Sequence, residues 1–89
     1  MLNKVYFIYD PSVGHVKIGR ARSPDHRLAQ LRADRKNPNM ILLGYVRAPG
    51  SYELELHKRF ARYRIGTTEY FWYGPLRKHI RTILSLREP

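Results

Sequence analysis

KVYFIYD (residues 4–10) and HVKIGRA (residues 15–21) are the stretches of the chain that decide its fold. Both are rich in β-branched and aromatic residues, which favour strands. Between them, Asp10, Pro11, Ser12 and Gly14 provide the side chains and backbone freedom that tight turns use. The sequence therefore predicts an antiparallel hairpin whose two strands cover these stretches.

A helix and a third strand are expected after the hairpin. Ser23 followed by Pro24 is typical of a helix start, and the helix is predicted to run to about Lys36. The NPN sequence at residues 37–39 ends it, because the residue before a proline is pushed out of helical geometry. MILLGYV (residues 40–46) is almost continuously apolar, which predicts a strand in a central or doubly covered position.

The second half of the chain predicts two more helices. Residues 51–64 form the first, after the APG break at residues 48–50, because Leu56, Phe60 and Tyr63 recur at helical spacing. A short extended segment follows at residues 69–73, and Gly74-Pro75 begins the last helix. The predicted fold class is α+β, a small antiparallel sheet of about three strands flanked by helices, in the order β-β-α-β-α-(β)-α.

Length and cysteine content exclude several classes of protein. With 89 residues the chain is expected to be one domain over residues 1–89, so sequence specificity would have to come from loops, a homodimer or a targeting partner. The absence of cysteine excludes disulfides, thiolate zinc sites and a cysteine nucleophile. We find no signal segment and no membrane-spanning run, so we expect a cytoplasmic protein without a membrane role.

The charge of the chain indicates a polyanionic partner. Lys and Arg number 17 against seven Asp and Glu, which gives a net charge of +10. The carboxylates are too few to pair with the arginines, so we expect many of the arginines to contact phosphates of DNA, with RNA as the alternative. The nucleic-acid contacts predicted in this way are Arg20, Arg22, Arg32, Arg35, Arg59 and Arg62.

Glu53 and His57 lie four residues apart and therefore share one helix face next to the apolar stripe. Spacing alone favours a plain interpretation of Glu53, since acidic residues stabilise helix N-termini. The pair is weak support for zinc, because no further ligands lie nearby in the sequence to complete a tetrahedral site. In the run of aromatics at residues 70–73, strand alternation predicts two side chains in the core and two facing outward, where they could stack on unpaired bases.

Taken in order, several short segments resemble the GIY-YIG nuclease superfamily. They are Val5-Tyr6, KIGRA at residues 17–21, Arg27-Leu28, Glu53 with Leu56-His57 and Phe60, and EYF at residues 69–71. The set is more narrowly similar to the phage and bacterial branch whose second tripeptide reads KIG. The resemblance covers most of the chain and implies a metal-dependent endonuclease that hydrolyses DNA phosphodiester bonds.

By this resemblance Tyr6, Arg27 and Glu53 are the central catalytic residues. Tyr6 would activate or orient the attacking water, Arg27 would stabilise charge on the phosphate, and Glu53 would hold a single Mg²⁺ or Mn²⁺ ion. Lys17 stands where the family usually has its second tyrosine, and it would lower the pKa of Tyr6 or of the water, or bind phosphate as a point charge. His57 would support the site either as a group behind the residues that contact the substrate or as a proton carrier. Glu69 matches an acidic position of this branch and ranks as secondary, as a turn cap or an arginine partner.

Three departures from the family pattern leave a second hypothesis open. Lys4 replaces the first glycine of the signature, Lys17 replaces the second tyrosine, and the asparagine that often follows the metal-binding glutamate has no counterpart. The alternative is a catalytically inactive DNA- or RNA-binding accessory module of a phage or mobile element that keeps the fold and its basic surface.

Overall fold

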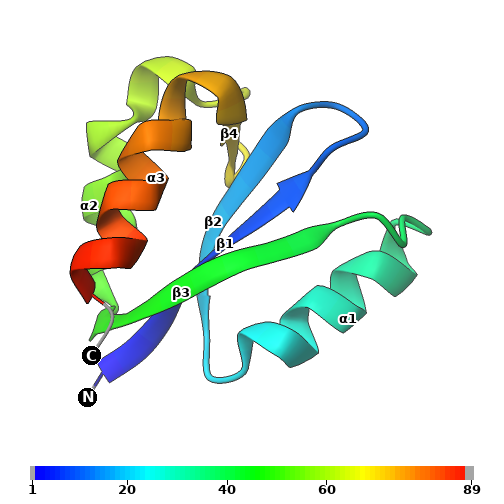
Figure 1. Ribbon diagram of the computed structural model, residues 1–89, viewed down its shortest axis with the longest axis horizontal. Helices are drawn as coiled ribbons and strands as arrows, with labels where there is room; N and C mark the ends of the chain where they lie inside the picture. Colours follow the sequence, from blue (N-terminus) through cyan, green and yellow to red (C-terminus); the bar gives the residue numbers. More distant parts are fainter. Residues whose placement is uncertain (1, 88–89) are drawn as a thin grey trace.

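A computed structural model describes residues 2–87 and shows an antiparallel sheet with helices on both faces (Figure 1). The predicted single domain over residues 1–89 includes residues 1, 88 and 89, which lie outside the described part. The elements are β1 (Leu2–Asp10), β2 (His15–Ala21), α1 (Pro24–Asp34), β3 (Ile41–Pro49), α2 (Ser51–Arg59), the 3₁₀ turn η1 (Ala61–Tyr63), β4 (Tyr70–Trp72) and α3 (Tyr73–Arg87). The predicted α+β class and element order are confirmed.

The sheet has four strands in the order β3-β1-β2-β4, one more than the predicted count. The short segment at Tyr70–Trp72 pairs with His15–Lys17 of β2 and so becomes a strand of the sheet. The predicted hairpin is confirmed, with Tyr6 opposite Gly19 and Ile8 opposite Lys17 in the register. In this order β2 lies between β1 and β4, and the polar residues of the candidate site are grouped around it.

Helix α1 covers one face of the sheet, while α2 and α3 cover the other (Figure 1). Because successive strand residues point to opposite faces, Val5 and Phe7 of β1 enter the core under α2 and α3, and Tyr6 and Ile8 enter the core under α1. Strand β1 is therefore buried on both faces.

Of the two positions predicted for the third strand, the central one is wrong, because β3 is an edge strand, and the doubly covered one is confirmed. Its apolar character reflects cover on both faces, since Leu42 packs in the core under α1 and Leu43 in the core under α2 and α3. The strand also continues through Pro49, where the sequence predicted a break. An edge strand tolerates proline because one side of its backbone has no ladder partner.

The first helix starts as predicted but is slightly shorter. The Ser23 hydroxyl accepts a hydrogen bond from the His26 amide at 3.2 Å, and Pro24 occupies the first helical position. The helix ends at Asp34, and Lys36 adopts a φ of 50°, the left-handed conformation that terminates helices.

The second helix ends at Arg59, five residues earlier than predicted. Beyond η1, Arg64 forms a bridge with Phe71, and the Ile65 amide donates to the Tyr70 carbonyl at 2.9 Å. Pairing with β4 therefore replaces the last helical turn. The resulting loop carries Glu69 back to the edge of β2.

Asp10 fixes the turn between β1 and β2. Its Oδ1 accepts hydrogen bonds from the amide and hydroxyl of Ser12 and, at 3.0 Å, from the Asn37 side chain. Burial of the carboxyl raises its pKa, but the bonds from Ser12 and Asn37 outweigh this effect and the pKa is lowered overall. The ionised carboxylate therefore contributes stability above the pKa of the unfolded chain, and this contribution is lost as pH falls through the folded-state pKa.

We expect Asp10→Asn to lower the free energy of unfolding by about 1 kcal/mol at pH 7, the difference between charged and neutral hydrogen bonds. The deficit should shrink as the pH is lowered into the range where Asp10 of the wild type becomes protonated. Urea denaturation of both proteins between pH 7 and pH 3 measures it. A deficit that stays constant over this range would contradict the assigned role of the charge.

Candidate functional site

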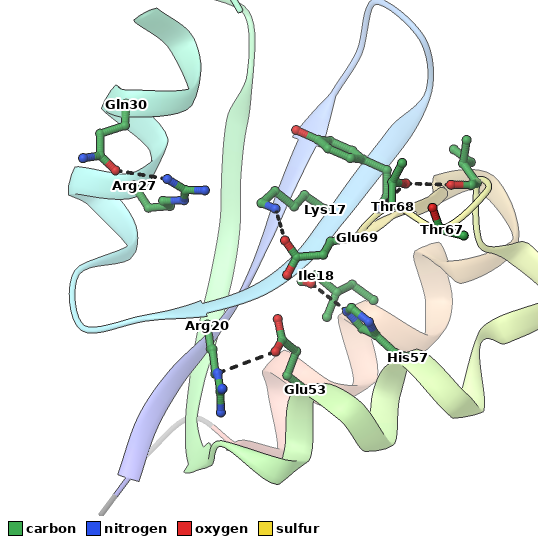
Figure 2. Close-up of polar contacts among 12 residues, drawn as sticks. Lys17, Ile18, Arg20, Arg27, Gln30, Glu53, His57, Thr67, Thr68 and Glu69 are labelled. Carbon is green, nitrogen blue, oxygen red and sulfur yellow. Dashed lines mark hydrogen bonds and ion pairs between the residues drawn. The ribbon is translucent and has the colours of Figure 1, made fainter. Parts of the chain in front are cut away.

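Two segments from the second half of the chain are attached to β2 at one residue, Ile18. The Ile18 amide donates to the Glu69 carbonyl at 3.0 Å, and the Ile18 carbonyl accepts a hydrogen bond from His57 Nε2 at 2.9 Å (Figure 2). A carbonyl can only accept, so Nε2 of His57 carries the proton. This anchoring brings α2, with Glu53 one turn before His57, beside the segment that carries Glu69.

Glu53 and Glu69 face one another at the edge of β2 (Figure 2). Burial of Glu53 raises its pKa, and the hydrogen bond and negative charge of Glu69 raise it further, while His57 and Arg20 act in the opposite direction. Arg20 Nε lies 3.7 Å from Glu53 Oε1, and the Arg20 side chain is half-exposed whereas the Glu53 side chain is nearly buried. The two carboxylates therefore form a close pair in which each affects the ionisation of the other.

Lys17 belongs to the same group of side chains. Its ammonium lies 2.6 Å from Glu69 Oε2, and the lysine side chain is only 6% exposed against 46% for that of Glu69. Burial raises the pKa of Glu69, but Lys17 more than compensates, so that the pKa of Glu69 is lowered. The pKa of Glu69 is therefore shifted in the opposite direction from that of Glu53.

Tyr6 approaches this group from β1 and Arg27 from α1. Burial raises the pKa of Tyr6 despite a hydrogen bond and a favourable charge from Arg27, so Tyr6 is a neutral phenol at physiological pH. The expected lowering of the pKa of Tyr6 by Lys17 is therefore wrong, and the reason is desolvation of the ring. The charges of Glu53 and Glu69 also act on the Tyr6 hydroxyl, which places Tyr6, Arg27 and the carboxylate pair in one electrostatic cluster.

Gly19 makes room for Tyr6. The two residues are opposite one another in the β1–β2 register, and the tyrosine ring lies across the glycine. A Cβ atom at position 19 would overlap the Tyr6 hydroxyl and lie 2.6 Å from Tyr6 Cζ. The glycine of the KIG tripeptide therefore accommodates the phenol, whereas the sequence only indicated a close approach by backbone or phosphate.

We expect Gly19→Ala to displace the Tyr6 hydroxyl and to lower the free energy of unfolding by about 1–3 kcal/mol, as overpacked sites do. Any activity that needs the phenol in place should fall by about 10²-fold, since displacements near 1 Å have this effect. The control is Gly74→Ala in α3, where an added Cβ meets nothing within 4 Å. Denaturation midpoints and reaction rates of the two variants provide the comparison, and equal behaviour would contradict the steric assignment.

The predicted metal ligand, Glu53, has only a second carboxylate close by. Among residues 2–87 no three His, Cys, Asp or Glu side chains are grouped so that they could hold a metal ion by themselves. Mg²⁺ commonly keeps several waters and uses one or two protein carboxylates together with phosphate oxygens. The repelling pair of Glu53 and Glu69 fits that mode of binding, and it does not fit a zinc site, which needs three or four protein ligands.

The six arginines predicted to contact nucleic acid do not lie on one surface. Arg20 lies beside Glu53, Arg22 is exposed after β2, and Arg35 lies over the Tyr70 ring at 4.6 Å. Arg32 donates two hydrogen bonds to the Met40 carbonyl, so it supports the connection between α1 and β3. The others are exposed on the second half of the chain, Arg59 in a hollow of about 390 Å³ between α2 and α3, and Arg62 over Tyr63. Their contacts with nucleic acid stay predictions.

The sequence predicted Tyr6, Lys17, Arg27, Glu53 and His57 as site residues, and the fold brings these five together around β2. It undervalued Glu69, which pairs with Lys17 and not with an arginine. Spacing could not reveal that pair, because its two residues are 52 positions apart. The feature of the sequence that could have identified Glu69 as a site residue is its position directly before an aromatic strand.

The arrangement defines a small α+β domain that gathers carboxylates, cations and a phenol at one strand. A family comparison matches residues 3–86 to the T5orf172 domain, so the chain belongs to the T5orf172 family, which occurs in phage-type endonucleases and is related to GIY-YIG-like nuclease folds. Searches of curated proteins and of solved structures returned no match. No helix among residues 2–87 is both long and apolar enough to cross a membrane.

Proposed function

We propose that the chain is a metal-dependent endonuclease that hydrolyses phosphodiester bonds of DNA. Its family supports a nuclease or DNA-binding role. The observation that carries the finer proposal is the single cluster formed by the neutral phenol of Tyr6, the guanidinium of Arg27 and the Glu53–Glu69 carboxylate pair. These groups come from four separate segments of the chain, and packing alone does not require them to converge.

Each group has a role that suits its protonation state. The guanidinium of Arg27 donates to the nonbridging phosphate oxygens, where negative charge develops in the transition state. The phenol of Tyr6 is neutral, so it orients the attacking water by hydrogen bonding and does not act as a phenolate base. Lys17, buried beside Glu69, adds a point charge close to the phosphate path.

Glu53, with Glu69 beside it, would hold Mg²⁺ or Mn²⁺. A bound ion supplies charge stabilisation for the departing oxygen and lowers the pKa of bound water. His57 positions the carboxylate, because its Nε2–H bond to Ile18 fixes α2 against β2. Its Nδ1 is not used by that bond and is the atom through which it would carry a proton.

A plasmid-nicking assay tests the proposal. We expect the purified protein to convert supercoiled plasmid to the nicked or linear form with Mg²⁺ or Mn²⁺ and not with EDTA. DNA binding is measured in parallel by fluorescence anisotropy in EDTA. Binding without nicking under every metal condition would contradict the enzyme and leave the binding module as the function.

A further inference from the structure

Trp72 is the single tryptophan of the chain, and half of its surface is exposed. Its neighbours in β4, Tyr70 and Phe71, are buried in the two cores, so packing accounts for them. Packing does not account for Trp72, which belongs to neither core. The one ring contact of Trp72 within residues 2–87 is an edge-on contact with His15, with the ring centres 4.8 Å apart.

Trp72 lies on the same face of the sheet as Lys17 of the candidate site. In the β2–β4 ladder Trp72 pairs with His15 and Tyr70 with Lys17, and alternate residues of a strand share a face. Trp72 is therefore two residues along β4 from Tyr70, and His15 two residues along β2 from Lys17, a backbone distance of about 7 Å in each case.

The surroundings of this face are cationic and aromatic. Lys17 lies 5.4 Å and Arg35 4.6 Å from the centre of the Tyr70 ring, on the site side of Trp72. Of the carboxylates nearby, Glu53 and Glu69 belong to the candidate site itself, and Asp10, opposite His15, is buried and hydrogen-bonded to Ser12 and Asn37. A DNA strand with a phosphate at the candidate site would therefore contact Lys17 and Arg35 first. The exposed ring of Trp72 lies two residues further along β4.

We propose that Trp72, supported by His15, stacks on an unpaired base of DNA next to the bond that is cut, so that the preferred substrate is DNA with unpaired nucleotides. The inference rests on the proposed endonuclease function for its setting, but it concerns binding. A base inside an intact duplex has no free face to offer a protein ring, whereas every unpaired base does.

The chain contains its own probe for this proposal, because Trp72 is its only source of tryptophan fluorescence. We titrate the protein in EDTA, where no cleavage is expected, with a single-stranded DNA oligonucleotide, with its perfect duplex and with RNA of the same sequence. The single strand should quench the fluorescence strongly and the duplex weakly. Equal quenching by both DNA forms, or none, would overturn the proposal, and tighter binding of RNA would overturn its assignment to DNA.

Variants give an independent measure by anisotropy with a labelled oligonucleotide. Trp72→Ala should weaken single-strand binding by about tenfold, the effect of losing one base–aromatic stack, and leave duplex binding unchanged. Trp72→Phe should keep most of the affinity and serves as the conservative variant if the alanine variant folds poorly. Leu86→Ala removes a more exposed apolar side chain on α3, across the sheet, and should change nothing. Equal losses for both DNA forms would refute the stacking role, while loss of nicking activity alone would leave it standing.

Discussion

Glu53→Gln is expected to abolish nicking, by on the order of 10²–10³-fold or more, while the protein stays folded and binds DNA as tightly as the wild type. Glutamine keeps the size of the side chain but removes the charge that would hold a divalent cation. The fold should tolerate the change, because burial and the neighbouring Glu69 raise the pKa of Glu53 and so disfavour its ionised form, despite the opposing effects of His57 and Arg20. Most losses of a buried, paired charge are destabilising, so retained stability is a specific expectation here.

Initial nicking rates in Mg²⁺, denaturation midpoints and anisotropy together test this expectation. The matched control is Glu55→Gln, two residues later in the same helix and exposed, which should leave all three measurements unchanged. Nicking by Glu53→Gln at more than about a tenth of the wild-type rate would remove Glu53 from the mechanism, since loss of a transition-state contact has a larger effect. A collapse of stability would show instead that Glu53 is structural.

Arg27→Ala is expected to reduce nicking by about 10²–10³-fold, since Arg27 is the guanidinium assigned to the transition-state charge. It should also affect Tyr6, because Arg27 donates a hydrogen bond to the phenol and is itself held by Gln30 Oε1 at 3.2 Å. Arg27→Lys should recover only part of the rate, because an ammonium keeps the charge but loses the planar fork of donors.

Arg22→Ala is the control for Arg27→Ala. Arg22 is exposed and takes part in neither of the two ion pairs found among residues 2–87. Its loss should weaken DNA binding and reduce the slope of log affinity against log salt by about 1, with little effect on the rate at saturating protein. If both variants lost affinity equally and neither lost rate at saturation, Arg27 would be an ordinary phosphate contact.

Local chemistry explains what the sequence predicted well. The hairpin follows from two β-branched, aromatic runs separated by turn residues, and the start of α1 follows from Ser23 and Pro24. Each of these signals is contained within a few residues, so no knowledge of distant contacts is needed.

Long-range pairing explains what the sequence predicted poorly. The apolar run at residues 40–46 indicated cover on both faces, but it could not show that β3 lies at an edge. The second helix was expected to reach Arg64, but it ends at Arg59, and Arg64 instead forms a bridge with Phe71. The same pairing of the chain places Glu69 beside Lys17. Glu69, which the sequence ranked as secondary, is therefore the site residue whose position depends most on tertiary structure.

Binding of a divalent ion to the Glu53–Glu69 pair is the property on which the proposed hydrolysis depends most directly. We would determine a crystal structure of the protein with Mn²⁺ and locate the ion by its anomalous scattering. We expect one peak in contact with Glu53, on the side of β2 where Tyr6 and Arg27 lie. A fully occupied Mn²⁺ site elsewhere with none at Glu53, or a Glu53 carboxyl that stays closed on Arg20 at saturating Mn²⁺, would contradict it.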